Sequence, residues 1–473
     1  MAFTDRLHNR GSISTGYDID HSLKVENDNR EYIRWTNFSN QGSEARKKKF
    51  SMSLWCKRTE LGRQQIIWST SQNGYLGFDA GDTVVWYQQY VGSGTQIGLR
   101  TTSVFRDTSA WYHFMIVVDT AQSTEANRVK MYVNGVQETV FGTPQTYPSQ
   151  NAQASNLYEQ HLILGEWGGG STGFSGYISD YYFLSEIAAS PTDLGKYDED
   201  TGIWKPKAYS GTISSPSHFL EFKDGSDLGT ATSGLDGDYL ENITAADQST
   251  DTPTNNFCTY NNNFRTATTI AATEGQTKVT TASGAGWVSI VATFGLTSGK
   301  WYWEAASSGH YVFYGIADVE SDVIPQATGG YFLGYGDDNS TKAIGMYGLN
   351  GQVYSDTAGH NGPGAAANTV VQIALDMDNR CVYFGANGSY ISGADPTSGA
   401  SKTNASQWNA NWTDTVYPAL SVYAGYHSTT NFGGYTTDVI SSAATDANGY
   451  GTFEYAPPSG YYAICTKNLA EYG

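Results

Sequence analysis

The feature that most constrains the fold is a strict alternation of apolar and polar residues that ends in Asn-Gly. In RVKMYVNG (residues 128–135) every second side chain is apolar, and Asn134-Gly135 closes the run. Alternation with period two lets one face of a strand pack on a core, and Asn-Gly tolerates the positive φ angles of a tight hairpin turn. The segment VVQIALDMDNRCVYFGANG (residues 370–388) repeats this pattern. Both segments predict antiparallel β-hairpins.

The composition favours short strands over long helices. The chain has 473 residues with 53 Gly, 34 Tyr and 12 Trp, and only 15% of its residues are charged, which is typical of strands joined by turns. One short helix is expected, because Ser190 can cap it, Pro191 suits its first position and Gly195 can end it. We predict an all-β protein with very little helix, built from two antiparallel, jelly-roll-like β-sandwiches in tandem.

A polar segment separates the two predicted sandwiches. Residues 236–264 are rich in Asn, Asp and Thr, lack alternation and contain Pro253, which is typical of a connection. We therefore predict four parts: an N-terminal attachment arm (1–16), a first sandwich (17–235), a linker (236–266) and a second sandwich (267–473).

The charge disfavours nucleic acid as the main partner. The formal net charge is −19, which leaves no broad basic face for a phosphate backbone. The one basic run, residues 46–49, is interpreted as a solvated turn, with anion or partner contact as the alternative. The first 15 residues carry charges where a signal peptide needs an apolar core, and no apolar run is long enough to span a membrane. We expect neither export by a signal peptide nor membrane insertion.

The four cysteines are expected to be reduced thiols. Cys56, Cys258, Cys381 and Cys465 lie far apart and form no C-x-x-C pair, so neither a metal cluster nor a disulfide framework is indicated. Cys56 and Cys381 lie in strand-like runs and are interpreted as small buried hydrophobes. Because free thiols persist in reducing compartments, we expect the chain to be synthesised in a reducing cytosol.

The first half resembles the laminin-G or concanavalin A-like family. The matching segments are FSMSLWCKR (50–58), WYHFMIVVD (111–119), NRVKMYVNG (127–135) and LILGEWGGGSTGFSGYISDYYFLSEIAA (162–189). The resemblance implies a two-sheet sandwich and allows calcium at its rim. No ligand set is assigned, because Asp79 and Asp82 in GFDAGD are explained more simply by a hairpin.

The second half resembles a SPRY domain, also a two-sheet sandwich. The matching segments are SGKWYWEA (298–305), YGIAD (314–318), FLGYGDD (332–338), the strand pair at 370–388, YPALSVY (417–423) and NFGG (431–434). In SGKWYWEA, alternation places Trp301 and Trp303 between the sheets, while Tyr302 and Glu304 face the other way.

The whole arrangement looks like a group of structural proteins of tailed bacteriophages, especially marine ones. The connector DQSTDTPTNNFCTYN (247–261) and the tail APPSGYYAICTKNLAEYG (456–473) carry most of this resemblance. It implies a fibre, spike or decoration on the virion surface, assembled in the host cytoplasm. The implied partners are other virion proteins and further copies of the chain, with a trimer as one form.

No catalytic constellation is found in the sequence. The Glu-x-Asp-x-x-Glu pattern of β-glucanases is absent, and so are G-x-S-x-G and H-E-x-x-H. The nearest approaches to the glucanase pattern are Asp376 with Asp378, where a strand meets its turn, and Asp198 with Asp200, in a hydrophilic connector, and neither pair is assigned to catalysis. Glu166 has no second carboxylate beside it. We therefore expect no enzymatic activity.

Exposed aromatic side chains beside amides would suit a glycan, because rings stack on sugars and amides bond to hydroxyls. The candidate binding residues are Trp408, Asn409, Asn411 and Trp412 in WNANWTD, Tyr426 and His427 in AGYHSTTN, and Trp167 in GEWGGG. Packing onto the sandwich or a subunit contact is the alternative for these loops. We expect a non-enzymatic virion surface protein that binds a host-surface glycan or protein, with capsid decoration or polysaccharide depolymerisation as alternatives.

Overall fold

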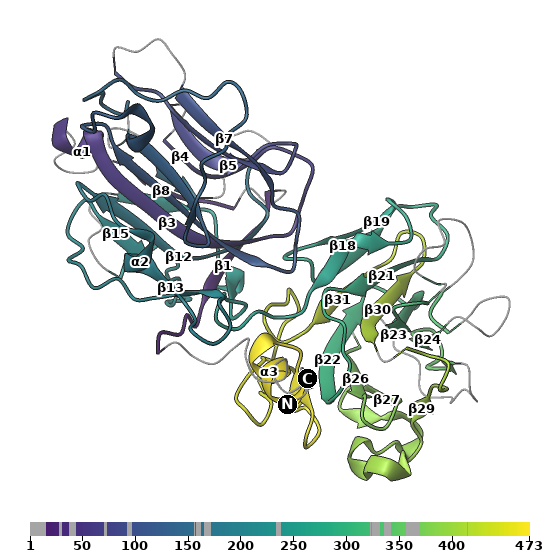
Figure 1. Cartoon of the computed structure of the whole chain (residues 1–473). Helices are drawn as coiled ribbons and strands as arrows, with labels where there is room; N and C mark the ends of the chain where they lie inside the picture. Colours follow the sequence, from purple (N-terminus) through teal and green to yellow (C-terminus); the bar gives the residue numbers. More distant parts are fainter. Residues whose placement is uncertain are drawn as a thin grey trace. The chain divides into compact units, whose positions relative to one another are not determined.

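The computed structural model describes residues 16–27, 31–36, 44–70, 73–91, 97–155, 157, 162–164, 172–232, 238–321, 323, 332–334, 342–355, 369–413 and 415–473. These residues form two compact units, an N-terminal unit from Ser14 to Asn255 and a C-terminal unit from Asn256 to Gly473. Each unit contains two large, mainly antiparallel sheets and little helix (Figure 1). The predicted all-β sandwich fold is confirmed.

The N-terminal unit pairs an eight-stranded sheet, in the order β10-β9-β8-β3-β12-β1-β17 with β15 beside β12, with a seven-stranded sheet in the order β16-β2-β11-β4-β5-β6-β7. Its strands are β1 (Ser22–Val25), β2 (Ile33–Thr36), β3 (Lys49–Arg58), β4 (Gln65–Thr70), β5 (Gly74–Phe78), β6 (Thr83–Gln88), β7 (Ile97–Val104), β8 (Trp111–Asp119), β9 (Val129–Val133), β10 (Val136–Gln137), β11 (Leu162–Leu164), β12 (Gly176–Ser185), β13 (Gly195–Tyr197), β14 (Trp204–Pro206), β15 (His218–Leu220), β16 (Asp238–Glu241) and β17 (Gln248–Ser249). Its helices are α1 (Glu44–Lys48), α2 (Pro191–Leu194) and the single turns η3 (Glu125–Asn127) and η4 (Ala245–Asp247).

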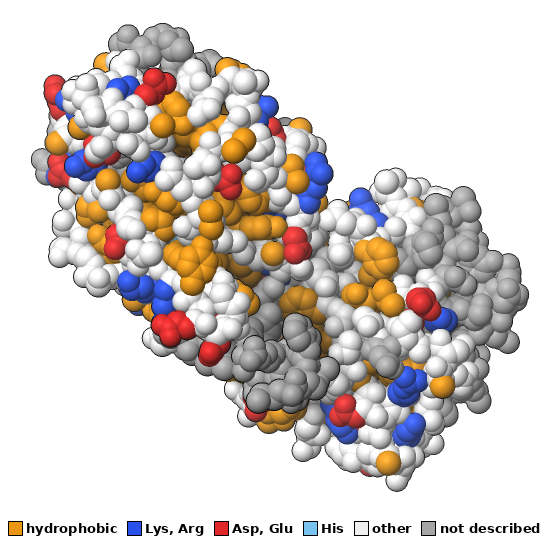
Figure 2. Space-filling view, viewed as in Figure 1, with side chains coloured by type: hydrophobic (Ala, Val, Ile, Leu, Met, Phe, Trp, Pro, Cys, Tyr) orange, Lys and Arg blue, Asp and Glu red, His pale blue; other side chains and the backbone are white. Residues whose placement is uncertain are grey.

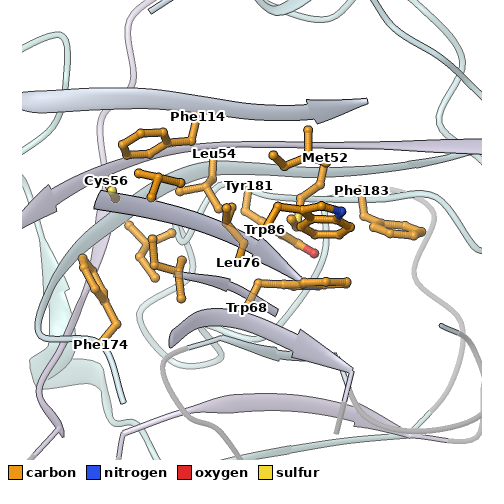
Figure 3. Packing of buried hydrophobic residues seen from close by; sticks show 14 of the residues in the cluster. Met52, Leu54, Cys56, Trp68, Leu76, Trp86, Phe114, Phe174, Tyr181 and Phe183 are labelled. Carbon is orange, nitrogen blue, oxygen red and sulfur yellow. The ribbon is translucent and has the colours of Figure 1, made fainter. Parts of the chain in front are cut away.

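Side chains from both sheets fill the space between them (Figure 3). On the seven-stranded sheet, Trp68 of β4 stacks on Trp86 of β6 with ring centroids 5.5 Å apart. On the other sheet, Phe50 of β3 stacks on Phe183 of β12 at 5.8 Å. Burial of a side chain such as Phe contributes roughly 1.5–3 kcal/mol, so this core is large enough to hold the unit together. Cys56 lies in it, as expected.

Local signals in the sequence placed several turns correctly. Asn134 and Gly135 have φ angles of 46° and 79° and close the β9–β10 hairpin. Helix α2 begins at Pro191, with the Ser190 amide donating to the Asp193 carboxylate at 2.8 Å. The basic run, predicted as a solvated turn, is instead mostly the end of helix α1, in which Lys48 pairs with Glu44 at 3.2 Å across one helical turn.

Asp180 is a buried carboxylate at an irregularity of β12. The register of β12 against β3 shifts between Ser179 and Tyr182, and Asp180 has a φ angle of 46°. The Tyr17 hydroxyl donates to Asp180 Oδ2 at 2.9 Å. Burial raises the pKa of Asp180 to about 7, helped by Glu221 and opposed by the hydrogen bond from Tyr17.

This raised pKa predicts that the contribution of Asp180 to the stability of the N-terminal unit declines as the pH rises. An unfolded Asp releases its proton near pH 4, so between about pH 4 and pH 7 the native chain keeps a proton on Asp180 that the unfolded chain has released, and the Asp180 contribution to the free energy of unfolding falls by about 4 kcal/mol across that window. Asp180→Asn should lack this decline, because Asn is neutral and tolerates positive φ. Urea unfolding at about pH 5 and about pH 8 measures it, and an equal pH dependence in both proteins would contradict the assignment.

Most of the predicted linker, 236–266, is built into the two units. Strand β16 pairs with β2, β17 pairs with β1, and β18 pairs with β21 in the C-terminal unit. Asp251 forms a buried ion pair with Lys57, with 2.8 Å between Oδ2 and Nζ, and Asp247 pairs with the buried Lys24 at 3.2 Å. Two aspartates of this polar segment are thus counter-ions for buried lysines.

The C-terminal unit pairs a six-stranded sheet, in the order β18-β21-β30-β23-β24-β25, with a nine-stranded sheet in the order β19-β20-β31-β22-β26-β27-β28, to which β29 and β32 add. Its strands are β18 (Tyr260–Arg265), β19 (Ile270–Thr273), β20 (Lys278–Thr281), β21 (Val288–Ala292), β22 (Lys300–Ser307), β23 (Val312–Asp318), β24 (Ala343–Tyr347), β25 (Val353–Tyr354), β26 (Val371–Asp376), β27 (Cys381–Ala386), β28 (Ser389–Tyr390), β29 (Ser406–Gln407), β30 (Val416–Val422), β31 (His427–Asn431) and β32 (Tyr462–Ala463). Its helices are α3 (Thr466–Tyr472), η5 (Ile391–Gly393) and η6 (Pro396–Ser401).

The nine-stranded sheet is covered on both faces. Trp301 and Trp303 of β22 lie in the core between the sheets, as predicted. Tyr302, on the opposite face, packs against Phe453 at 5.1 Å between ring centroids. The Glu304 carboxylate accepts hydrogen bonds from the backbone amides of Glu454 and Tyr455, both at 2.8 Å. The C-terminal segment therefore covers the outer face of this sheet.

The connector and the tail, which carried the phage resemblance, lie side by side. The Cys258 amide donates to the Ile464 carbonyl at 3.0 Å, and the Thr466 amide donates to the Asn256 carbonyl at 2.9 Å. The four cysteines, all among the described residues, are buried and form no disulfide. Among the described residues, no helix has both the length and the apolar character that crossing a membrane requires.

Candidate functional site

Aromatic side chains gather on the outer face of the six-stranded sheet. Along β23, Val312, Tyr314 and Ile316 point into the core, so Phe313 and Ala317 point outward. In β24 and β30 the same alternation places every second side chain on this outer face. We call this surface the aromatic face and define it as Trp287, Tyr311, Phe313, Phe332, Tyr347, Tyr423 and Tyr426.

The base of the aromatic face is a set of rings in direct contact. Phe313 lies opposite Tyr347 in the β23–β24 register, and their rings stack at 4.6 Å with an interplanar angle of 8°. Phe332 stacks on Phe313 at 4.2 Å, and Trp287 meets Phe313 edge-on at 5.1 Å. Offset and edge-on pairs of this kind are the favoured aromatic geometries, so the rings hold one another in place.

The outer part of the aromatic face is accessible. Tyr311 is 38% exposed and Tyr423 is 40% exposed. Their ring centroids lie 5.8 Å apart, and Tyr423 also lies 5.3 Å from Trp287. Tyr426 extends the row, 5.2 Å from Tyr311. Several adjoining rings on a rigid sheet form a platform on which a ligand with flat apolar faces can stack.

The groups that shift the pKa of Tyr347, at the base of the aromatic face, are uncharged. Burial raises the pKa of Tyr347, and the neighbours that contribute are all tyrosines, namely Tyr311, Tyr354 and Tyr426. The hydroxyl groups of Ser289 and Ser421, between the strands that carry the rings, bond to each other at 2.7 Å. This arrangement suits the stacking of an uncharged ligand whose hydroxyl groups meet tyrosine hydroxyls at the rim.

The structure corrects the expectation of an exposed tryptophan platform in WNANWTD. Trp408 is 5% exposed and Trp412 is 3% exposed, and both belong to the core of the C-terminal unit. Their rings stack on each other at 5.3 Å, and the Trp412 amide donates to the Asn409 carbonyl at 3.3 Å. This turn directs both indoles inward and leaves Asn409 and Asn411 exposed, so the tryptophan faces cannot meet a sugar.

The remaining predicted binding residues fall in different places. Tyr426 belongs to the aromatic face. His427 is half-buried, its amide donates to Ser308 Oγ at 3.2 Å, and burial together with Lys278 lowers its pKa. Trp167 and Glu166 lie outside the described residues.

The candidate catalytic carboxylates have structural roles. Asp376 pairs with Lys300 at 2.9 Å and accepts hydrogen bonds from the backbone and side chain of Asn379 at 2.9 and 2.8 Å. Asp378 accepts from the Gly299 amide at 2.9 Å. Asp198 accepts from the Thr201 amide and hydroxyl at 2.9 and 2.7 Å. The contacts with Asn379 and Thr201 close local turns, whereas those with Lys300 and Gly299 tie the β26–β27 turn to the start of β22.

The carboxylates considered for calcium are engaged by other groups. Asp79 Oδ1 accepts from the Gly81 and Thr83 amides at 2.9 and 3.1 Å, which closes the β5–β6 hairpin. Asp82 pairs with Arg58 and Arg106, both at 3.0 Å.

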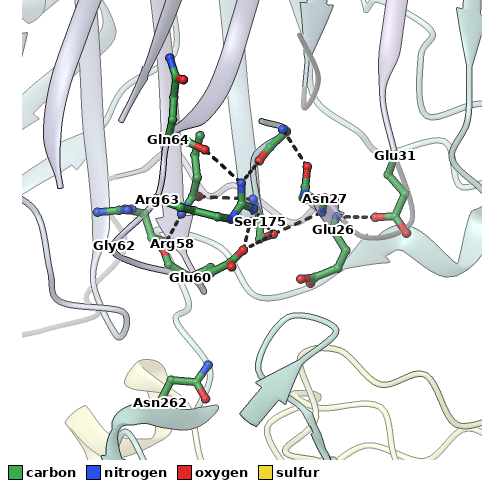
Figure 4. Close-up of polar contacts among 12 residues, drawn as sticks. Glu26, Asn27, Glu31, Arg58, Glu60, Gly62, Arg63, Gln64, Ser175 and Asn262 are labelled. Atoms are coloured by element: carbon green, nitrogen blue, oxygen red, sulfur yellow. Dashed lines mark hydrogen bonds and ion pairs between the residues drawn. The ribbon is translucent and has the colours of Figure 1, made fainter. Parts of the chain in front are cut away.

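In the polar cluster of Figure 4, the carboxylate of Glu60 is likewise engaged by a neighbouring side chain. Arg63 pairs with Glu60 at 2.6 Å and donates to Ser175 Oγ at 3.0 Å. Within the described ranges, no group of three or more His, Cys, Asp or Glu residues is placed to hold a metal ion.

The sequence contained a signal for the aromatic face that motif reasoning missed. Tyr311 and Phe313 are two residues apart and share a face, while Val312 and Tyr314 share the other. A strand with large side chains on both faces has to bury one set and leave the other for a second layer or a ligand. Trp287, Tyr347 and Tyr423 join this face only through strand pairing, which local spacing cannot show.

Residues 27–193 match the family model described as the Concanavalin A-like lectin/glucanases superfamily, and the match lies within the N-terminal unit. Among curated proteins, none matches this sequence. The description covers both lectins and glucanases, so the match alone does not distinguish binding from hydrolysis. The engaged carboxylates described above favour binding.

Several solved structures share weak similarity with the chain. The SPRY domain of human HERC1 has 15% identity and a TM-score of 0.27, covering 36% of this chain and 96% of that one. The PSpry domain of TRIM65 has 14% identity and a TM-score of 0.28, covering 37% and 91%. A candidate carbohydrate-binding protein from Bacteroides ovatus has 15% identity and a TM-score of 0.29, covering 42% and 54%.

Charged side chains are spread over the molecule. On the face shown in Figure 2, Lys and Arg appear singly or in small groups among uncharged side chains. The described residues on this face present no continuous cationic strip of the kind that follows a phosphate backbone.

Proposed function

We propose that this chain is a non-enzymatic, glycan-binding protein on the surface of a bacteriophage particle, and that the aromatic face holds a host-surface glycan. The observation that carries the binding proposal is the continuous set of rings on one rigid sheet, with Tyr311 and Tyr423 accessible at its edge. A pyranose ring presents flat C–H surfaces that stack on such rings, and its hydroxyl groups find partners at the polar rim.

The particle context rests on the resemblance of the connector and the tail to phage structural proteins. In this proposal the chain is assembled in the host cytoplasm, where its buried thiols stay reduced, and residues 1–16 attach it to other virion proteins as part of a tail fibre, spike or head fibre. A trimer of the chain would bind the host surface with higher avidity than one copy does, because linked sites raise the effective ligand concentration.

The site geometry favours binding over depolymerisation. Retaining glycosidases hold two carboxyl groups about 5–5.5 Å apart across the sugar and inverting enzymes hold them about 6.5–9.5 Å apart. No carboxylate is among the residues of the aromatic face, and Asp376, Asp378 and Asp198 of the candidate pairs elsewhere are engaged in structural contacts. Release of reducing sugar from host polysaccharide by the purified chain would overturn the non-enzymatic proposal.

Tyr423→Ala should weaken binding of host envelope polysaccharide about tenfold, because a ring that becomes buried on binding contributes about 1.5 kcal/mol or more and 1.4 kcal/mol is tenfold. Tyr197→Ala is the matched control, since Tyr197 is 48% exposed in the other unit. Calorimetric titration of both variants measures the effect, and equal losses in the two would argue against the aromatic face.

Electron microscopy of intact particles, labelled with an antibody against residues 267–473, tests the virion assignment. Label at tail or fibre tips supports host recognition. Label spread over the head supports the alternative of capsid decoration, and particles that carry no label would contradict the proposal.

A further inference from the structure

The outer face of the seven-stranded sheet in the N-terminal unit carries a second pair of accessible rings. Tyr75 on β5 lies opposite Tyr87 on β6, and their rings stack at 5.3 Å with an interplanar angle of 23°. Leu76 and Trp86, their neighbours in sequence, point the other way into the core, so both tyrosines stand on the outer face. The Gln89 amide nitrogen donates to the Tyr87 hydroxyl at 3.1 Å, which fixes the orientation of that ring.

A position without a side chain, Gly98, adjoins this pair. Gly98 on β7 lies opposite Tyr87, on the side away from Tyr75. A Cβ atom added at Gly98 would meet one heavy atom of the described residues within 4 Å, the Trp86 carbonyl oxygen at 3.5 Å. Tyr75 covers one face of the Tyr87 ring, and the other face borders this position. Among the described residues, β7 therefore places no side chain from Gly98 against this side of the Tyr87 ring.

An arginine lies next along the same strand. Arg100 is two residues beyond Gly98 and so projects from the same face, about 7 Å along β7. Its side chain is 56% exposed, and its Nε pairs with Asp79 Oδ2 at 3.2 Å. Among the described residues no partner is recorded for its two terminal nitrogens. A guanidinium held at one edge presents its other edge to a carboxylate, with two parallel N–H donors.

We propose that this place is a second sugar site, which takes an acidic sugar residue such as a uronic acid. The pyranose stacks on Tyr87 above Gly98, and its carboxylate pairs with Arg100. The long-range field of a chain with net charge −19 repels an anionic polymer, so recognition of an acidic sugar needs a local cation beside the stacking ring. This site lies in the N-terminal unit and does not rest on the function proposed for the aromatic face.

The test is calorimetric titration of the intact chain with tetragalacturonate and with cellotetraose, its neutral counterpart. Arg100→Gln should weaken tetragalacturonate binding about tenfold or more, because a charge-assisted pair is lost, and should leave cellotetraose binding unchanged. Gly98→Val places a side chain beside Tyr87 and should weaken both. Lys223→Gln, which alters a cation whose side chain is 59% exposed elsewhere in this unit, should change neither.

Three results would overturn the proposal: no binding of tetragalacturonate by the wild-type chain, binding that survives both Arg100→Gln and Gly98→Val, or binding that is lost in Tyr423→Ala instead. The last result would place the acidic sugar on the aromatic face. Binding of tetragalacturonate that survives Tyr423→Ala while host polysaccharide fails to bind would uphold this site and reject the proposed function, so the two failures are distinguishable.

Discussion

Asp251→Ala is expected to lower the free energy of unfolding of the N-terminal unit by about 3–5 kcal/mol. Asp251 Oδ2 lies 2.8 Å from Lys57 Nζ, and its Oδ1 accepts a hydrogen bond from Trp111 Nε1 at 3.0 Å. The side chains of Lys57 and Asp251 are 0% and 1% exposed. Removing the carboxylate leaves the lysine charge buried without the anion that neutralises it, which is far more costly than removing the whole pair.

Two further variants separate this explanation from a general effect of substitution. Replacing both partners with apolar residues, Lys57→Met with Asp251→Leu, should restore most of the lost stability, because no charge is left buried. Asp200→Ala, at an exposed position, should change stability by no more than about 0.5 kcal/mol. Urea unfolding measures all three proteins. A double variant no more stable than Asp251→Ala would show that packing, and not charge, decides the effect.

Trp412→Ala is expected to lower the free energy of unfolding of the C-terminal unit by about 3–5 kcal/mol, as the loss of a buried tryptophan does. Trp412 is 3% exposed and stacks on Trp408, so the substitution opens a cavity in the core. Asn411→Ala, at the exposed neighbouring position, is the matched control and should stay within about 0.5 kcal/mol.

The same pair of variants separates a core role from a sugar-binding role for this segment. Molecules of Trp412→Ala that remain folded should bind host polysaccharide as tightly as the wild type. If stability is unchanged and affinity falls, the indole contacts the ligand and its assignment to the core is wrong.

Patterns that depend on near neighbours were predictable from the sequence. The alternation in residues 128–135 and the turn at Asn134-Gly135 appear as β9 and its hairpin, and the Ser190 and Pro191 signals appear as α2. Trp301 and Trp303 face the core because period-two alternation fixes which side chains share a face.

Features that depend on distant parts of the chain were not predictable in this way. The short strands of residues 236–266 show no alternation, and Asp247 and Asp251, which lie between these strands, pair with the buried Lys24 and Lys57. Strand β26 looked half-buried but is buried on both faces, because the C-terminal segment covers its sheet. Helix α3 was missed because its stability depends on such packing.

The candidate site was only partly visible for the same reason. Tyr426, a candidate binding residue from the sequence, lies on the aromatic face. Trp408 and Trp412 follow the alternative interpretation and pack into the core, because loop position alone does not determine exposure. The contact of Tyr311 with Tyr423 joins residues more than one hundred positions apart, and only the pairing of β23 with β30 brings them together.

The central claim, that a host glycan lies on the aromatic face, is tested most directly by fluorine NMR of the intact chain with 5-fluorotryptophan at its 12 tryptophan positions. The Trp287 signal is assigned with Trp287→Phe, and host envelope polysaccharide is then added. Binding on the aromatic face predicts that the Trp287 signal shifts while the signals of the buried Trp408 and Trp412 do not. A saturating concentration of polysaccharide that leaves the Trp287 signal unshifted, or that shifts the Trp408 and Trp412 signals instead, would contradict the central claim.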